Sequence, residues 1–205
     1  MIDLYTWTTS NGQRAAIALE ECGLAYRVHR VDLSKDEQHA PAFLAINPAG
    51  VVPAIVDPDG PGGAPLSLAQ SGAIAMYAAT KSGRFLPADP AQRAIALQWL
   101  FFACTDAASA SGALYYLGVR APEKSEPNLR YLSERLVAIL RVADRHLARQ
   151  DWLAGELSIA DFALYPVVAV RRALVDGAGD LPHLLRWADA LGARPGVARG
   201  MTAAD

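Results

Sequence analysis

Cysteine is scarce in this sequence: two are found among 205 residues, and they stand far apart at Cys22 and Cys104. This spacing forms neither a CxxC pair, nor a cluster of metal ligands, nor a disulfide framework. We therefore expect no bound metal. Cys22 should lie in a helix and Cys104 deep in a helical region, both as buried structural residues.

An excess of charge of one sign is also missing. Nineteen lysines and arginines are balanced by 21 aspartates and glutamates, so the net charge is -2, without the basic footprint of a nucleic-acid-binding protein. No apolar run reaches the length of about 18 residues that a spanning helix needs. We expect no secretion signal, since Asp3 directly follows Ile2 and interrupts any apolar segment at the amino terminus. The composition predicts a well-packed cytoplasmic protein that binds neither nucleic acid nor a membrane.

The hydrophobic pattern changes near residue 85. Before it, short apolar runs predict strands over residues 2–5, 26–31, 51–56 and 66–68. Good helix formers predict helices over 13–22 and 70–81. The first strand–helix–strand unit favours parallel pairing. After it, the long segments are helical, including an amphipathic stretch over 129–147 and an apolar one over 159–175. We predict an α/β domain over 1–82, a connector over 83–89 and an all-helical domain over 90–205.

Pro53 stands at the start of an apolar strand. One interpretation is an edge proline, because proline cannot donate a hydrogen bond to a strand ladder. The other is a cis proline, in which case Val52 turns its backbone N–H and C=O outward to pair with an extended peptide. The residues alone leave both interpretations open.

Two polar segments adjoin expected helix starts. Ser71 stands where the helix over 70–81 begins, and its simplest role is a helix cap. The same geometry suits a carboxylate ligand, and Gln70 could bond an amino-acid head group. The loop over residues 8–12 holds hydroxyl and amide side chains that are either turn and cap residues or donors aimed at an anion, such as a thiolate, beside a helix amino terminus.

Ser158 and Asp161 have the spacing of a capping box, with aspartate in place of the usual glutamate. We interpret this pair as a folding device at the start of the apolar helix. We do not expect it to be a catalytic site.

In their order and spacing, these segments resemble the cytosolic glutathione transferase family from the first strand to about residue 195. More narrowly, the Thr9-x-Asn11-Gly12 loop, the Glu20-Glu21 pair and residues 98–101 are similar to the bacterial nu class, whose members reduce disulfides with glutathione. The resemblance implies a thioredoxin-like amino-terminal domain followed by an all-α carboxy-terminal domain. It also implies glutathione as co-substrate and a homodimer.

Carried over by position, the resemblance implies that Asn11 and Thr9 face the glutathione sulfur. Ser10 stands where the class has a proline and adds a rival hydroxyl. Gln70 and Ser71 would bind the γ-glutamyl group, although the class usually has an acidic residue in place of Gln70.

The remaining contacts follow in the same way. Val52, before cis Pro53, would pair with the cysteinyl backbone, Gln38 would contact the glycine end, and Arg130 would reach the ligand from the helical domain. Residues 106–117 lack the usual pattern of the class in the stretch that should line the second-substrate site.

The resemblance thus implies an enzyme that activates glutathione thiolate. The thiolate attacks either a disulfide or an electrophilic carbon of a small substrate, and the sequence does not decide between the two reactions. A different class of function is a non-catalytic glutathione-binding regulatory or interaction protein, because a fold does not by itself imply turnover.

Overall fold

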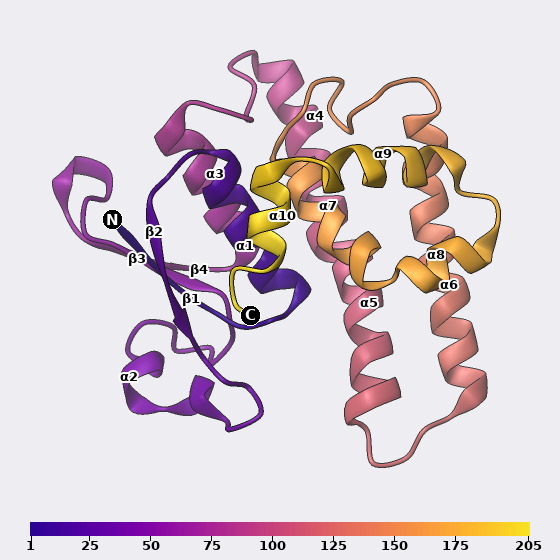
Figure 1. Cartoon of the computed structure of the whole chain (residues 1–205), viewed down its shortest axis with the longest axis horizontal. Coiled ribbons are helices and arrows are strands. Elements are labelled where there is room, and N and C mark those ends of the chain that lie inside the picture. Colours follow the sequence, from indigo (N-terminus) through magenta and orange to yellow (C-terminus); the bar gives the residue numbers. More distant parts are fainter. The chain divides into compact units, whose positions relative to one another are not determined.

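The computed structural model describes all residues from Met1 to Asp205, and the chain forms two compact units (Figure 1). The first unit contains Met1–Leu86 and Ala193–Asp205, and the second contains Pro87–Gly192. The last residues, which we expected in the helical domain, belong instead to the first unit. The reason is that helix α10 (Pro195–Met201) packs along helix α1 (Ser10–Glu21).

The first unit contains a four-stranded mixed sheet. Its spatial order is β2-β1-β3-β4, with bounds Ile2–Thr6 for β1, Tyr26–Arg30 for β2, Ala54–Asp57 for β3 and Leu66–Ala69 for β4. As predicted, β1 pairs in parallel with β2, whereas β3 is antiparallel to both β1 and β4. On β1, Leu4 is fully buried and its neighbour Tyr5 is half-buried on the opposite face, as the alternation of side chains in a strand requires.

Strand β3 begins later than the pattern predicted. We expected a strand from residue 51, but the ladder starts at Ala54. Pro53 has no N–H group to donate. The carbonyl of Val51 instead accepts from the side-chain amide of Asn47, at 2.6 Å.

The first unit also contains helices. They are α1, α2 (Pro41–Leu44), α3 (Ser71–Ser82) and α10, with the short 3-10 turns η1 (Glu37–His39) and η2 (Pro61–Gly63). Helix α1 packs against α3, and its apolar positions, such as Ile17 and Leu19, are completely buried. A second cluster joins Phe43 of α2 to Val31 and Ala54.

Helix α10 approaches α1 very closely. A Cβ atom on Gly200 would lie 2.6 Å from Cα of Ile17, so only glycine fits there. Two ion pairs flank this contact: Arg194 Nη2 lies 2.6 Å from Glu21 Oε2, and Arg199 Nε lies 2.7 Å from Glu20 Oε2. Close packing and ion pairing together attach the carboxy-terminal residues to the first unit.

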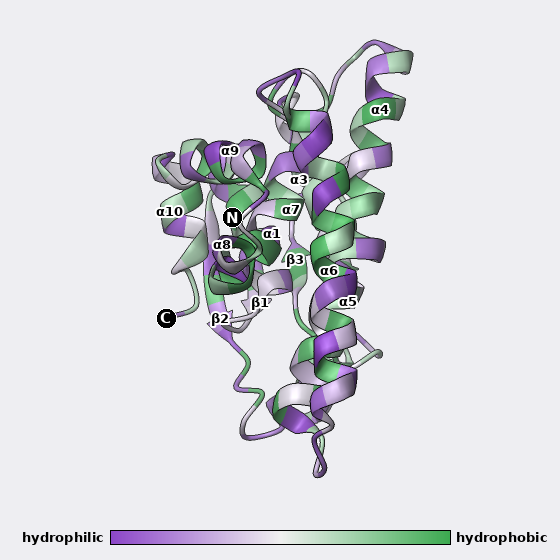
Figure 2. Cartoon of the chain, turned by 90° about the vertical axis from the view of Figure 1, so that its right-hand side faces the viewer, coloured by the Kyte–Doolittle hydropathy of each residue, from purple (hydrophilic) through white to green (hydrophobic).

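The second unit is entirely helical. It contains α4 (Pro90–Phe101), η3 (Phe102–Ala107), α5 (Ala108–Tyr115), η4 (Tyr116–Arg120), α6 (Glu126–Leu147), α7 (Ile159–Val170), α8 (Arg172–Ala178) and α9 (Pro182–Gly192). The wider π-helical turns η3 and η4 interrupt the helical run at the two ends of α5. Figure 2 shows hydrophilic and hydrophobic bands along α6, whose buried residues include Leu136, Leu140 and Leu147, so the predicted amphipathic helix is confirmed.

The apolar segment over 159–175 is two helices rather than the one that we predicted. Helix α7 ends at Val170, and Arg171 leaves the helical conformation with φ -104° and ψ 19° before α8 begins. The guanidinium of Arg171 bonds to Ser111 of α5, with Nε 3.0 Å from the hydroxyl and Nη2 2.6 Å from the carbonyl. The helix therefore breaks at Arg171, where the apolar run ends and a charged side chain needs polar partners.

The two cysteines differ in their surroundings. Cys22 is buried as expected, and this burial raises the pKa of its thiol. Cys104, in η3, is only partly buried, so the prediction for it was wrong.

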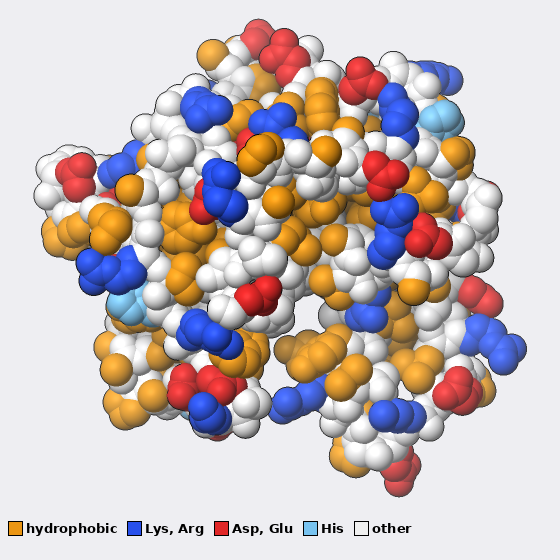
Figure 3. Space-filling view, in the orientation of Figure 1, with side chains coloured by type: hydrophobic (Ala, Val, Ile, Leu, Met, Phe, Trp, Pro, Cys, Tyr) orange, Lys and Arg blue, Asp and Glu red, His pale blue; other side chains and the backbone are white.

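The surface on the face drawn in Figure 3 carries lysine and arginine side chains interspersed with aspartate and glutamate. No helix has both the length and the apolar character that crossing a membrane requires. Histidine, cysteine, aspartate and glutamate side chains form no group of three or more that could hold a metal ion.

Candidate glutathione site

The amino terminus of α1 is built from the loop that follows β1. Thr9 is the N-cap, with extended backbone angles, and its Oγ1 accepts from Gly12 N at 3.0 Å. A Cβ atom at Gly12 would lie 2.3 Å from the carbonyl oxygen of Trp7, so the loop can fold onto the helix only with glycine there. The first turn carries no acidic residue. The positive end of the helix dipole is therefore not neutralised by a side chain of the same turn.

Asn11 and Ser71 share one buried partner. The Arg14 side chain is 1% exposed, and its Nη1 lies 2.7 Å from Asn11 Oδ1 and 2.8 Å from Ser71 Oγ. Our sequence analysis named Asn11 and Ser71 but missed Arg14. The available signal was the position of a charged residue three places after Asn11, on the same face of the helix and directly before the apolar run of residues 15–19.

The other two loop candidates differ in their local role. The Thr9 hydroxyl oxygen caps α1 by accepting from Gly12 N. Its hydroxyl hydrogen can therefore still be donated to a ligand. Ser10 is the first residue of α1 and is partly exposed.

Ser71 does not cap helix α3. The N-cap position belongs to Gln70, and no side chain caps this helix. Our simplest interpretation of Ser71 as a cap was therefore wrong, because its oxygen bonds to Arg14 instead. Gln70 is exposed and has φ 73° and ψ 113°, an uncommon conformation for a residue other than glycine. Backbone outliers of this kind concentrate at functional sites.

The peptide bond between Val52 and Pro53 is cis, so of the two interpretations of Pro53 the structure confirms the cis proline. Both residues are buried just before β3. Gln38 lies in η1, where its Nε2 donates to Asp36 Oδ1 at 2.8 Å. Its Oε1 is buried and has no partner within the protein.

Arg130 stands apart from these residues in the chain. It lies on α6 in the second unit, with its side chain exposed. Residues 106–117, the stretch expected to line the second-substrate site, extend from η3 through α5 into η4. The candidates Thr9, Ser10, Asn11, Gln38, Val52, Pro53, Gln70 and Ser71 all belong to the first unit.

A mixed sheet of this order, a cis proline before its third strand in sequence and a following all-helical unit define the glutathione transferase fold, as predicted. Two family models match the chain: "Glutathione S-transferase, N-terminal domain" over residues 9–81 and "Glutathione S-transferase, C-terminal domain" over residues 102–195. The chain belongs to the glutathione S-transferase family.

Similar proteins agree with this assignment. The chain is 37% identical over 204 residues to the disulfide-bond oxidoreductase YfcG of Escherichia coli, covering 98% of this chain and 94% of that protein. A glutathione transferase from Pseudomonas putida, solved with one glutathione disulfide per subunit, is 38% identical with a TM-score of 0.91, over 98% of this chain and 90% of that one. A family member from Pseudomonas fluorescens, solved with two glutathione molecules bound, is 35% identical with a TM-score of 0.91, over 98% and 92%.

Proposed function

We propose that this protein is a glutathione-dependent enzyme that reduces disulfides. The observation that carries the proposal is the amino terminus of α1, where the Thr9 hydroxyl and the Asn11 amide stand in a turn free of acidic residues. Neutral donors beside the positive end of a helix stabilise an anion. The similarity to YfcG, which is named a disulfide-bond oxidoreductase, favours a disulfide as the second substrate.

The anion that these donors stabilise is the thiolate form of the glutathione sulfur. A free thiol has a pKa of about 8.5, and lowering it by two units requires about 2.7 kcal/mol. One or two directed hydrogen bonds together with the helix dipole supply a free energy of this size. We assign Asn11 and Thr9 to the sulfur, with Ser10 as the rival hydroxyl.

We assign the other groups of glutathione to the remaining candidate residues of the first unit. Gln70 and Ser71 bind the γ-glutamyl group, and the backbone N–H and C=O of Val52 pair with the cysteinyl unit. Gln38, whose Oε1 lacks a protein partner, contacts the glycine end.

The reaction follows the rules of thiol–disulfide exchange. The bound thiolate attacks one sulfur of the substrate disulfide, a mixed disulfide forms, and the other sulfur leaves as a thiolate. A second glutathione thiolate then attacks the glutathione sulfur of the mixed disulfide. Glutathione disulfide forms and the remaining substrate thiolate is released, so two glutathione molecules are oxidised for each disulfide reduced.

Two assays test this proposal on the purified protein. We expect turnover of bis-hydroxyethyl disulfide with glutathione, and much slower conjugation of an aryl chloride. The double variant Thr9→Ala/Asn11→Ala should bind glutathione but lose most of the reductase activity. Turnover of the aryl chloride alone would replace disulfide reduction with conjugation. Retention on a glutathione column without turnover in either assay would favour a glutathione-binding regulator.

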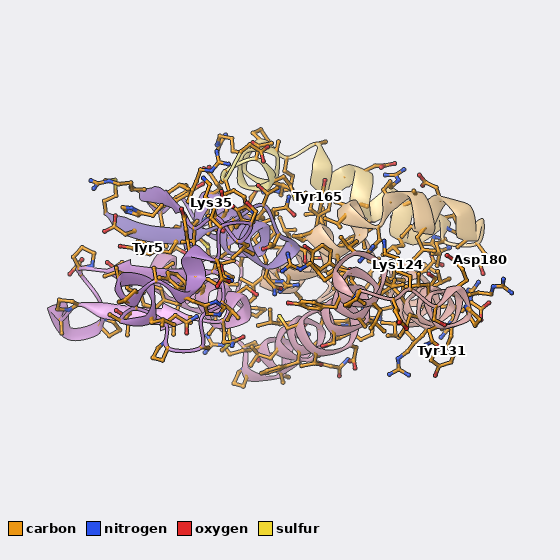
Figure 4. The ribbon with its side chains drawn as sticks, turned by 90° about the horizontal axis from the view of Figure 1, so that it is seen from below. Tyr5, Lys35, Lys124, Tyr131, Tyr165 and Asp180 are labelled. Carbon is orange, nitrogen blue, oxygen red and sulfur yellow. The ribbon has the colours of Figure 1, made fainter.

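We also propose that the protein is a homodimer. The second unit leaves large apolar side chains exposed, including Phe101 at 58% on α4 and Tyr131 at 62% on α6, and Figure 4 shows Tyr131 at the outer side of its helix. Exposed apolar surface of this kind is a common feature of subunit contacts. Sedimentation should give twice the monomer mass, and Phe101→Asp should shift it toward the monomer if α4 forms the contact.

A further inference from the structure

We propose that Arg14 is a positioning residue that orients Asn11 and Ser71 as hydrogen-bond donors toward the sulfur and the γ-glutamyl carboxylate of glutathione. This inference rests on the proposed function, because it assumes that Asn11 serves the sulfur and Ser71 the γ-glutamyl carboxylate. It adds a residue that contacts neither of these two groups itself and acts through Asn11 and Ser71.

The argument begins with the chemistry of the guanidinium. An arginine side chain has five N–H donors and no acceptor. The atom that faces Arg14 Nη1 at 2.7 Å must therefore be the oxygen of the Asn11 amide, not its nitrogen. The amide group is thereby oriented, and its Nδ2 is the end directed away from Arg14.

The same reasoning applies to Ser71. Its Oγ lies 2.8 Å from Arg14 Nη1 and must accept from it. A serine hydroxyl that accepts in this way still has its own O–H to donate. Arg14 therefore leaves one donor at Asn11 and one at Ser71.

Both groups of glutathione that these donors would meet are acceptors. A thiolate and a carboxylate are anionic and have no proton to donate. Without Arg14, the Asn11 amide could rotate about its last bond and present its oxygen to the thiolate, which is repulsive. The arrangement thus decides whether Asn11 stabilises or destabilises the charged sulfur.

The position of Arg14 makes it suited to this role. The side chain is almost completely buried. Asn11 and Arg14 lie one turn apart on α1, whereas Ser71 begins α3, 57 residues further along the chain. Because one nitrogen serves both partners, a change at either should be felt at the other, as groups in one hydrogen-bond network are energetically coupled.

The experiment compares Arg14→Met and Arg14→Lys with Arg27→Met, which removes an exposed arginine of β2. The pKa of the bound glutathione thiol is titrated by its thiolate absorbance, and the glutathione dissociation constant is measured separately. Arg14→Met should raise the thiol pKa by about one unit, for example from about 6.5 to about 7.5, which lowers the thiolate fraction at pH 7 about threefold. It should also weaken glutathione binding several-fold. Arg14→Lys should lie between wild type and Arg14→Met, and Arg27→Met should match wild type.

A second variant avoids the risk that loss of a buried arginine unfolds the protein. Asn11→Asp keeps an oxygen acceptor for Arg14 but removes the amide donor. It should melt close to wild type and yet raise the thiol pKa at least as much as Asn11→Ala. If the thiol pKa of Asn11→Asp stays at the wild-type value, the proposed orientation of Asn11 is wrong.

The outcomes separate this inference from the proposed function. If Asn11→Ala and Ser71→Ala both leave the thiol pKa and glutathione affinity unchanged, the site assignment itself fails. If these two variants are impaired but the folded Arg14 variants behave like Arg27→Met, only the positioning role fails. A double-mutant cycle between Asn11→Ala and Ser71→Ala should show coupling, and strict additivity would also overturn the inference.

Discussion

Trp187 donates its indole N–H to Asp161 Oδ1 at 2.9 Å, joining helix α9 to the start of α7 inside the second unit. The same oxygen accepts from Leu153 N at 3.0 Å, and Oδ2 accepts from the backbone N–H of Ser158 at 2.9 Å. Asp161 is completely buried. One carboxylate therefore satisfies donors from three segments of the chain.

We expect Asp161→Ala to lower the free energy of unfolding by about 3 kcal/mol or more. The substitution removes the capping box and leaves several buried donors without an acceptor, each costing about 1–3 kcal/mol. Chemical denaturation followed by circular dichroism measures this loss.

Asp161→Asn is the matched control. It keeps one acceptor oxygen but places an N–H₂ group against other donors, so its loss should be smaller than that of alanine. A variant with lowered activity and unchanged stability would contradict the structural role.

The loop over residues 8–12 predicts different losses of activity for substitutions at its three candidate residues. Asn11→Ala should lower the reductase rate at least about tenfold, while glutathione binding stays largely intact, because one hydrogen bond to a charged group contributes about 1.5–3 kcal/mol. Thr9→Ala should reduce the rate somewhat less, although it also removes the cap of α1. A severe Ser10→Ala together with a silent Asn11→Ala would move the catalytic role to the serine.

Two glycines with different surroundings predict opposite effects of substitution by alanine. Gly200→Ala should destabilise the protein by about 1–3 kcal/mol, because the new methyl group meets the backbone of Ile17. Gly177→Ala, in α8, meets nothing within 4 Å and should stabilise the helix by about 0.5–1 kcal/mol. Thermal melts of both variants make the comparison. Equal melting temperatures would mean that α10 does not pack on α1 in solution.

The buried carboxylate of Asp57 predicts a dependence of stability on pH. It accepts from the Tyr77 hydroxyl and lies 2.9 Å from Lys81 Nζ, which also lies 3.7 Å from Asp59. Burial by itself would raise the pKa of Asp57, but the hydrogen bonds from Tyr77 and Lys81 outweigh it and lower the pKa. The folded protein therefore binds this proton less readily than the unfolded chain, in which aspartate titrates at about 3.9.

The sign follows from this difference. The stabilisation is fully present above the unfolded pKa and disappears as the pH falls through the lower folded value. Asp57→Asn should thus cost about 2 kcal/mol at neutral pH, and progressively less as the pH falls below about 4. Melting curves of the wild type and of Asp57→Asn across this pH range measure the difference in stability between them. A difference that stays constant down to the lowest pH at which the proteins fold would contradict the lowered pKa of Asp57.

Local sequence determined much of the fold. Parallel pairing of the first two strands, the amphipathic helix α6 and the capping box of Ser158 and Asp161 all appeared as expected. These features depend on periodicity or on partners within one helical turn, so they can be read from neighbouring residues. The helix break at Arg171 could not, because the partner of its guanidinium is Ser111, on a different helix.

The resemblance of the sequence to a known family also identified the loop over residues 8–12, the segment of Val52 and Pro53 and the Gln70–Ser71 pair as candidates for one site. Only the tertiary structure decided how two of them are connected, by bringing Ser71 to the guanidinium that Asn11 also contacts. It likewise decided that the last helix belongs to the first unit. Both outcomes depend on packing between segments far apart in the chain, where a buried charge must find partners and a glycine permits close approach. No pattern of neighbouring residues contains that information.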